Sequence, residues 1–280
     1  MKITTEQPSV LPYLNGNGHG MRFIHPEAQI GKNVTIEPFT TIGRDVVIGD
    51  DTWIGPHVTI MDGARIGKGC KIFPGAVVGA VPQDLKFKGE YSLVELGDGV
   101  IVREYVTLNR GTQASHRTSI GTGSLLMAYV HIAHDCHIGR HCVLANGVTL
   151  AGHIEVEEFA ILGGLTAVHQ FVKVGSHAFV GGGSLVRKDV PPFVKAAREP
   201  LSYAGINSIG LRRRGFDSGQ IHQIQDIYRI LFVQGYNTTQ AIEIIETEID
   251  ATAERDYILE FVRKADRGIM RGFQQMNGRR

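Results

Sequence analysis

The sequence predicts a mainly β protein, a parallel β-helix of hexapeptide repeats followed by a small α-helical domain. Of its 280 residues, 35 are glycine, well above the usual share of about 7%. An aliphatic residue recurs at every sixth position through most of the chain, which is typical of stacked repeat units. After Pro192 that period stops, and apolar residues follow helical spacing instead.

The hexads form three blocks that keep one frame. Ten hexads begin at Ile24 and extend to position 78, three cover first positions 96–108, and twelve cover 120–186; every one of these 25 first positions holds Ile, Leu or Val. The fifth position is nearly always small or β-branched, which suits a narrow stacked interior. With three hexads in each coil, the repeats predict roughly eight coils at the ~4.8 Å spacing of neighbouring strands.

Glycine stands at the second position in 12 of the 25 hexads, for example Gly31 and Gly49. Because glycine adopts backbone conformations that other residues avoid, we expect this position to form the bend of each repeat. Cys70, Cys136 and Cys142 all fall at the fifth position, which predicts small core side chains rather than thiol sites. Three cysteines without CxxC spacing also favour a reducing compartment over a disulfide framework.

Two interruptions of the frame predict insertion loops, near 81–95 and near 110–118. They fall in the tenth and thirteenth hexads, so three-fold winding puts both on the same side of the solenoid. Insertions of this kind are loops on one face, which is often the binding face.

The chain therefore divides into three parts. Residues 1–20 are expected to be a flexible leader, residues 21–192 the β-helix domain, and residues 193–280 a connector and a C-terminal helical domain. In the last part Ser218, and then Thr238 or its neighbour, precede apolar residues at helical spacing and are expected to cap helices.

Composition excludes several classes of function. The 29 Lys and Arg against 28 Asp and Glu leave a net charge of +1, so no overall field draws the protein to nucleic acid or to an anionic membrane. The sequence has no run of about 18 apolar residues, and its start lacks the apolar stretch of a signal peptide. We expect a soluble cytoplasmic protein with no stable membrane insertion.

Eight of the twelve histidines lie between positions 116 and 177. His134, His153, and His169 with Gln170 fall in the sixteenth, nineteenth and twenty-second hexads, which are consecutive coils on the side of both insertions. That convergence predicts a functional site. Solvated surface positions are expected instead for the following histidines: His25, His57, His141, His177 and His222. For His131, His137 and His169, spacing alone leaves a functional and a structural role equally open.

A zinc site is the alternative interpretation of this histidine column. Solenoid carbonic anhydrases bind zinc through three histidines. Ligands on a first and a third coil would stand ~9 to 10 Å apart, however, whereas zinc requires nitrogens at about 2.0 to 2.1 Å. The sequence also lacks the His-x4-His pair of those enzymes. We therefore expect neither a metal nor another cofactor.

Several stretches resemble one enzyme family. They are Pro82-Gln83-Asp84-Leu85-Lys86-Phe87, His131-Ile132-Ala133-His134-Asp135-Cys136, Leu150-Ala151-Gly152-His153, Ala167-Val168-His169-Gln170-Phe171, Asp189-Val190-Pro191-Pro192, Gly205-Ile206-Asn207 and Arg213-Arg214-Gly215-Phe216. In this order, from about Met21 to the C-terminus, they resemble the acyl-[acyl-carrier-protein]–UDP-N-acetylglucosamine O-acyltransferases of lipid A biosynthesis.

The resemblance implies that the coil is left-handed and that the protein is a homotrimer with active sites in clefts between neighbouring β-helices. It implies transfer of a 3-hydroxyacyl chain from the phosphopantetheine thioester of acyl carrier protein to the 3-hydroxyl of UDP-N-acetylglucosamine. Another hexapeptide-repeat enzyme, such as a zinc-dependent hydratase, and an acyltransferase that uses a 3-amino sugar nucleotide remain the alternatives.

The family pattern also implies the site residues. His134 matches the general base, Asp135 the acid that orients it, and Gly152 the residue whose backbone N–H faces the thioester oxygen. Substrate-binding positions are Gln83, Asp84, Lys86, His131, His153, His169, Gln170, Asn207 and Arg213. Gly182 matches the residue that ends the acyl groove. Ile209 stands where family members carry an acidic residue two places after the tail asparagine.

The expected chemistry suits these residue types. A sugar hydroxyl is a poor nucleophile at neutral pH, so an imidazole with a pKa near 6.5 can take its proton during attack on the thioester. A backbone amide at a glycine can stabilise the resulting oxyanion, because no side chain blocks close approach. This reaction needs neither a metal nor a covalent acyl-enzyme.

Overall fold

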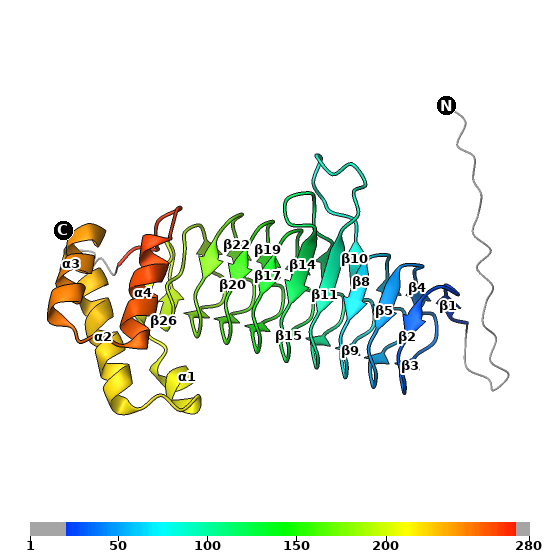
Figure 1. Ribbon diagram of the computed structural model, residues 1–280, viewed down its shortest axis with the longest axis horizontal. Helices are drawn as coiled ribbons and strands as arrows, with labels where there is room; N and C mark the ends of the chain where they lie inside the picture. The colour runs from blue at the N-terminus through cyan, green and yellow to red at the C-terminus, as the bar shows by residue number, and fades with distance from the viewer. Residues whose placement is uncertain (1–20, 273–280) are drawn as a thin grey trace.

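The computed structural model describes residues 21–272, so the leader expected at 1–20 lies outside the described residues. Three sheets of short strands form the long faces of a prism, and four helices gather at its C-terminal end (Figure 1). The prism is the predicted left-handed parallel β-helix, and the small helical region follows it.

Each sheet takes one strand from every coil. Sheet A has the spatial order β1 (Phe23–Ile24), β4 (Thr41–Ile42), β7 (Thr59–Ile60), β10 (Val77–Ala80), β13 (Thr107–Asn109), β16 (His131–Ile132), β19 (Thr149–Leu150), β22 (Ala167–Val168), β25 (Leu185–Val186). Sheet B has the order β2 (Gln29–Ile30), β5 (Val46–Ile48), β8 (Ala64–Ile66), β11 (Leu93–Leu96), β14 (Arg117–Ile120), β17 (His137–Ile138), β20 (Glu155–Val156), β23 (Lys173–Val174). Sheet C has the order β27 (Ser202–Ile206), β26 (Val194–Ala197), β24 (Phe179–Val180), β21 (Ile161–Leu162), β18 (Val143–Leu144), β15 (Leu125–Leu126), β12 (Ile101–Val102), β9 (Lys71–Ile72), β6 (Trp53–Ile54), β3 (Thr35–Ile36).

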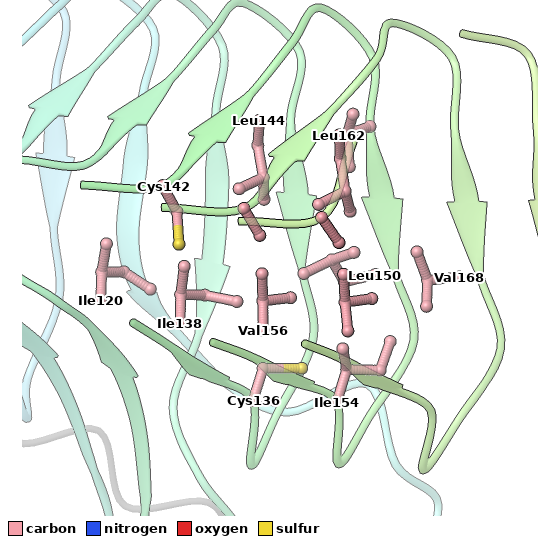
Figure 2. Packing of buried hydrophobic residues seen from close by; sticks show 14 of the residues in the cluster. Ile120, Cys136, Ile138, Cys142, Leu144, Leu150, Ile154, Val156, Leu162 and Val168 are labelled. Carbon is pink, nitrogen blue, oxygen red and sulfur yellow. The ribbon is translucent and has the colours of Figure 1, made fainter. Parts of the chain in front are cut away.

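The interior of the prism is filled by the first and fifth positions of the hexads. First-position residues such as Ile132 and Leu150 are fully buried and pair in register across neighbouring coils. Figure 2 shows Cys136 and Cys142 among these aliphatic side chains, and both are free thiols without exposure. Burial raises the pKa of each of these two thiols to about 12, so they are core residues, as their position in the hexad predicts.

The expectation that second-position glycines form the bends is wrong. The left-handed backbone conformation falls at the fourth position, where most residues carry a side chain; Asp135 has a φ of 58° and His153 a φ of 62°. The second-position glycines have another role, since a Cβ on Gly49 would lie 2.6 Å from the carbonyl carbon of Gly67 in the next coil. Glycine is needed there because the backbones of stacked coils approach closely.

Both insertions lie at one edge of the prism. The first joins β10 to β11 and the second joins β13 to β14, so each leaves sheet A and returns to sheet B. We call this corner the A–B edge. Figure 1 shows the two loops projecting from the same side of the prism, as the three-fold winding predicts.

The C-terminal region begins as a continuation of sheet C. Strand β26 pairs with β24 in parallel and with β27 in antiparallel fashion. The helices α1 (Ser208–Arg213), α2 (Ser218–Phe232), α3 (Thr238–Glu248) and α4 (Ala253–Arg263) follow. The buried hydroxyl of Tyr228 in α2 donates a hydrogen bond to the Pro192 carbonyl at 2.6 Å, which ties the helices to the last coil.

The helix caps lie one residue earlier than expected. Asp217 caps α2 and Asn237 caps α3, and each forms a capping box with a glutamine three residues later. Ser218 and Thr238 are therefore the first helical residues. Asp217 and Asn237 are the caps because each side chain accepts a hydrogen bond from the backbone N–H of the glutamine three residues later. The side chain of that glutamine in turn accepts a hydrogen bond from the backbone N–H of the cap. Among residues 21–272, no helix is both long and apolar enough to cross a membrane.

Candidate active site

The A–B edge brings together the histidines that the hexad numbering places at matching positions of consecutive coils. His134 follows β16, His153 follows β19, and His169 with Gln170 follows β22, and these three strands are neighbours in sheet A. His131 lies within β16 itself. The edge therefore carries the predicted column beside the two insertion loops.

His134 and Asp135 form a buried pair. The Nδ1 of His134 lies 2.8 Å from Oδ2 of Asp135, and His134 is only 5% exposed. Because an ionised carboxylate accepts only, Nδ1 carries the hydrogen of this bond. The pair therefore leaves the other ring nitrogen, Nε2, free to act as a base.

Asp135 is held by the second insertion loop as well as by His134. The Thr112 hydroxyl lies 2.6 Å from Oδ2 of Asp135, and the Ser115 hydroxyl lies 2.5 Å from Oδ1. Burial alone would raise the pKa of Asp135, but the hydrogen bonds from Ser115, Thr112 and His134 outweigh it and hold that pKa well below its usual value. Asp135 is thus a permanent anion at neutral pH.

Gly152 lies directly against the His134 ring. A Cβ at Gly152 would stand 2.6 Å from Cε1 and 2.8 Å from Nε2 of His134, so the ring occupies the space of the missing side chain. The Gly152 N–H has no acceptor among residues 21–272. It is a free donor next to the nitrogen that is free to act as a base.

His153 completes the polar cluster one coil further along. Its ring meets the His134 ring edge-on at 5.0 Å and stacks on Phe171 at 4.6 Å. Its Nδ1 is 3.9 Å from Oδ2 of Asp135. Burial lowers the pKa of His153, partly opposed by the Asp135 charge. His153 is therefore a rigid, mostly neutral wall of the site.

Other predicted substrate contacts surround this cluster. The Nδ1 of His131 shares a 2.7 Å hydrogen bond with the Thr107 hydroxyl, and burial lowers the pKa of His131. His169 and Gln170 are exposed, and His169 lies 3.3 Å from the guanidinium of Arg267. In the first insertion loop Gln83 and Lys86 are exposed and Asp84 is half-buried; Asp84 accepts a hydrogen bond from the Lys86 backbone at 3.0 Å.

Three of the predicted residues do not join this cluster within one chain. Asn207 caps α1 and is 95% buried, with its side chain donating to the His177 carbonyl at 3.0 Å. Arg213 ends α1. Gly182 follows β24, at the edge where the chain passes from sheet C to sheet A. The single chain thus holds the predicted catalytic residues on one edge and these three elsewhere.

The expected solvation of His177 is wrong. It is only 8% exposed and stacks between Phe159 and Phe193 at 4.9 Å and 5.7 Å. Burial, with a smaller effect of Arg214, lowers its pKa to about 4. The C-terminal region folds back over the edge between sheets B and C, where His177 lies, and the local sequence around His177 does not reveal this.

Two cavities differ in their relation to the His134–Asp135 pair. A cavity of about 280 Å³ is lined by Asp135, His153 and Phe171 and extends to Lys173 and Arg267. A larger one of about 620 Å³ lies between the solenoid and α4, beside His177. Size does not identify the active site here, because the larger cavity contains none of the His134 cluster.

The zinc alternative has one feature in its favour. Donor atoms of His134, Asp135 and His153 lie within 4.8 Å of one another, so three ligands could converge. Nδ1 of His134 already donates a hydrogen bond to Asp135, however, and both carboxylate oxygens of Asp135 accept hydrogen bonds from the second insertion loop. A metal ligand must supply a lone pair that is not already used in a hydrogen bond. These residues therefore fit a hydrogen-bonded His134–Asp135 pair better than a zinc site.

Sequence reasoning missed the groups that support the cluster. Thr112, Ser115 and Thr107 contact its acid and its histidines, and Phe171 stacks on His153. Thr107 was identifiable, since it stands one coil before His131 in the frame. Thr112 and Ser115 were not, because they lie in an insertion that has no frame.

Comparisons with protein families agree with this architecture. Residues 189–270 match the family described as Udp N-acetylglucosamine O-acyltransferase, Domain 2. Residues 45–80 and 117–152 match the family of bacterial transferase hexapeptide repeats. The two matches fall on the C-terminal region and on the solenoid respectively.

Curated relatives are similar over most of the chain. An acyl-[acyl-carrier-protein]–UDP-N-acetylglucosamine O-acyltransferase from Aliivibrio fischeri is 51% identical over 260 residues, which are 90% of this chain and 99% of the relative. The enzyme of the same name from Thiobacillus denitrificans is 45% identical over 195 residues, 69% of this chain and 76% of the relative.

Solved structures match the whole architecture. A UDP-N-acetylglucosamine acyltransferase from Bacteroides fragilis has a TM-score of 0.88 at 49% identity, with 89% of this chain and 98% of that chain covered. The enzyme from Francisella novicida has a TM-score of 0.87 at 40% identity, with 91% and 93% covered.

Proposed function

The chain belongs to the acyl-[acyl-carrier-protein]–UDP-N-acetylglucosamine O-acyltransferase family, and we propose that it performs the family's reaction with His134 as general base. The protein is an O-acyltransferase that moves an acyl chain from acyl carrier protein to UDP-N-acetylglucosamine, the first step of lipid A biosynthesis. The acyl group we propose is a 3-hydroxyacyl chain, and the acceptor atom is the 3-hydroxyl of the sugar.

The single observation that carries the proposed mechanism is the 2.8 Å bond between His134 Nδ1 and Asp135 Oδ2. The ionised Asp135 fixes the tautomer, so the Nε2 lone pair faces the reacting sugar hydroxyl. As the hydroxyl oxygen attacks the thioester carbon, Nε2 takes its proton, and Asp135 stabilises the imidazolium that forms. The same imidazolium then returns the proton to the leaving thiolate of phosphopantetheine.

Gly152 has two roles in this proposal. Its free N–H supplies a preorganised donor to the oxyanion of the tetrahedral intermediate, and its missing side chain makes room for the His134 ring. Neither role requires a metal or a covalent acyl-enzyme. Cys136 is not a nucleophile in this scheme, because burial raises the pKa of its thiol to about 12.

Substrate binding is assigned to the groups around the pair. Asp84, Lys86, Gln83 and His131 would hold the sugar nucleotide near Nε2, and the remaining contacts come from His153, His169 and Gln170. Arg213 suits a diphosphate, because a guanidinium can donate two parallel hydrogen bonds to phosphate oxygens. With Ile209 two places after Asn207, the uracil contacts lack an acidic partner at that position.

A homotrimer would complete this site. Asn207, Arg213 and Gly182 lie away from the A–B edge of their own chain, so a cleft between two chains can unite them with His134. Large apolar side chains also stand exposed along the edge between sheets C and A: Phe39, Tyr105, Tyr129 and Leu165. A strip of this kind favours association with another chain. The three free cysteines suit a cytoplasmic location.

A product assay tests the proposed function. Purified protein is incubated with 3-hydroxyacyl carrier protein and equal amounts of UDP-N-acetylglucosamine and its 3-amino analogue, and the products are separated by mass. We expect a 3-O-ester as the main product without added metal. A dominant amide product would favour the 3-amino sugar acceptor, whereas ester formation that vanishes with a chelator and returns with zinc would contradict the metal-free mechanism.

A further inference from the structure

We infer that Thr112 and Ser115, in the loop between β13 and β14, are positioning residues of the acyl transfer. They act through Asp135, whose carboxylate they hold in the orientation that fixes His134. This inference rests on the proposed function and adds to it a role for the second insertion, which the repeat frame leaves unexplained.

The loop donates to both oxygens of one carboxylate. The Thr112 hydroxyl donates to Oδ2 of Asp135 at 2.6 Å, and the Thr112 backbone N–H donates to Oδ1 at 3.0 Å. The Ser115 backbone N–H donates to Oδ1 at 3.2 Å. Oδ2 is also the oxygen that accepts from His134. The loop therefore fixes the plane of the carboxylate to which the histidine is bonded.

Thr112 is the stronger of the two anchors. The Ser115 hydroxyl has one hydrogen, and both Asp135 Oδ1 and the Arg117 carbonyl lie within reach, at 2.5 Å and 2.8 Å. The Thr112 hydroxyl has no such competing acceptor, since its other contact is a bond accepted from the Ala114 backbone at 3.3 Å. Its single hydrogen is therefore donated to Oδ2 of Asp135.

Burial makes these donors necessary. The Asp135 side chain is 1% exposed, and Thr112 is 7% exposed. A buried carboxylate that lacks donors takes up a proton or turns towards water. Either change would release Nδ1 of His134 and let its ring rotate. The coils themselves supply no other donor to Asp135 among the described residues apart from His134.

Several titratable groups lie near the pair, and the charged side chains of Glu155, Lys173, Asp189, Asp266 and Arg267 line the same cavity as Asp135. His153 faces Asp135 from the next coil, and the charges of Asp84 and His137 also reach His153. Cys136 contacts the His134 backbone carbonyl through its thiol, which stays protonated. None of these groups donates a hydrogen bond to the oxygens that Thr112 and Ser115 hold, so the loop has no substitute.

The test compares Thr112→Val, Thr112→Ser and Ser115→Ala with the wild type. Valine keeps the shape of threonine but removes the donor. We expect Thr112→Val to lower kcat by about 10- to 100-fold with little change in KM, because the base is misoriented while the substrate contacts remain. Thr112→Ser should recover most of that loss, and Ser115→Ala should show a smaller one.

The pH dependence of kcat/KM separates positioning from a merely structural role. A carboxylate that takes up a proton or turns away stabilises the imidazolium less, so the acid limb of the profile should move to lower pH in Thr112→Val. Thr118→Val is the matched control. Thr118 begins the coil after the same loop and is fully buried, and its hydroxyl has no partner among the described residues. We expect wild-type kcat and a wild-type acid limb for it.

Two outcomes would overturn the inference while leaving the proposed function intact: wild-type kcat in Thr112→Val, or an equal loss in Thr112→Val and Thr112→Ser with an unmoved acid limb. If Thr112→Val does not fold, Thr112→Ala, which also lacks the hydroxyl, takes its place, and wild-type kcat in both Thr112→Ala and Ser115→Ala would contradict the role. If the wild type itself transfers no acyl chain, the proposed function fails instead.

Discussion

Substitution of Gly152 by alanine is the most informative perturbation of the catalytic pair. The added Cβ would stand 2.6 Å from Cε1 and 2.8 Å from Nε2 of His134. Gly152 does not have a positive φ, so alanine fits the backbone and keeps the N–H proposed to stabilise the oxyanion. The variant therefore changes one thing, the space available to the His134 ring.

The size of the effect follows from the distances. Ordinary contacts begin near 3.4 Å, so the ring must retreat by about 0.8 Å, while its Nδ1 is held at 2.8 Å by Asp135. A misplacement of about 1 Å at a reacting group costs on the order of 100-fold in rate, or about 2.7 kcal/mol. Because the amide donor remains, the loss should appear in kcat more than in KM.

Steady-state transfer from 3-hydroxyacyl carrier protein, with a thermal melt of each variant, measures this effect. Gly164→Ala is the control, because it occupies the same hexad position two hexads further along and so lies on another edge, and its Cβ would approach only the Asn146 carbonyl at 3.2 Å. We expect near wild-type kcat for the control. Wild-type kcat in a folded Gly152→Ala variant would refute the reasoning that His134 is fixed against Gly152.

Three further predictions concern other parts of the molecule. His177 has a pKa of about 4 in the fold against about 6.5 in the unfolded chain, so stability should fall as pH drops from about 6.5 to about 4; melting curves of His177→Phe should show a weaker fall across that window, and an equal fall would contradict it. Gly182→Met should shorten the acyl chain preferred in a competition between carrier proteins, since even a Cβ there would be 3.1 Å from the Gly164 carbonyl; an unchanged preference would remove Gly182 from the groove. Cys136→Ala should keep kcat within about threefold of wild type, because its thiol is buried and protonated at neutral pH; a 100-fold loss would indicate a thiol role.

The repeat pattern alone predicts most of the fold. An apolar residue at every sixth position fixes which residues stack, so the pairing of His131 with Thr149 and the shared edge of both insertions follow from arithmetic. The role of the second-position glycines did not follow. A missing Cβ looks the same in sequence whether it serves an unusual φ or, as at Gly49, the close approach of the next coil.

The sequence predicts those site residues that lie within the hexad frame. His134, Gly152 and His153 share one column because the frame places them there, whereas Thr112 lies in an insertion where no period predicts its neighbours. The burial of His177 depends on a C-terminal region that folds back from far along the chain. Such contacts are set by tertiary packing, which local spacing does not encode.

The general base is the central claim, and His134→Ala tests it most directly. Transfer of a 3-hydroxyacyl chain from acyl carrier protein to UDP-N-acetylglucosamine is measured with wild type and with the folded variant. Removal of a positioned general base should lower kcat by about 10²- to 10⁴-fold. A folded His134→Ala protein that transfers the chain at a rate near that of the wild type would contradict the mechanism.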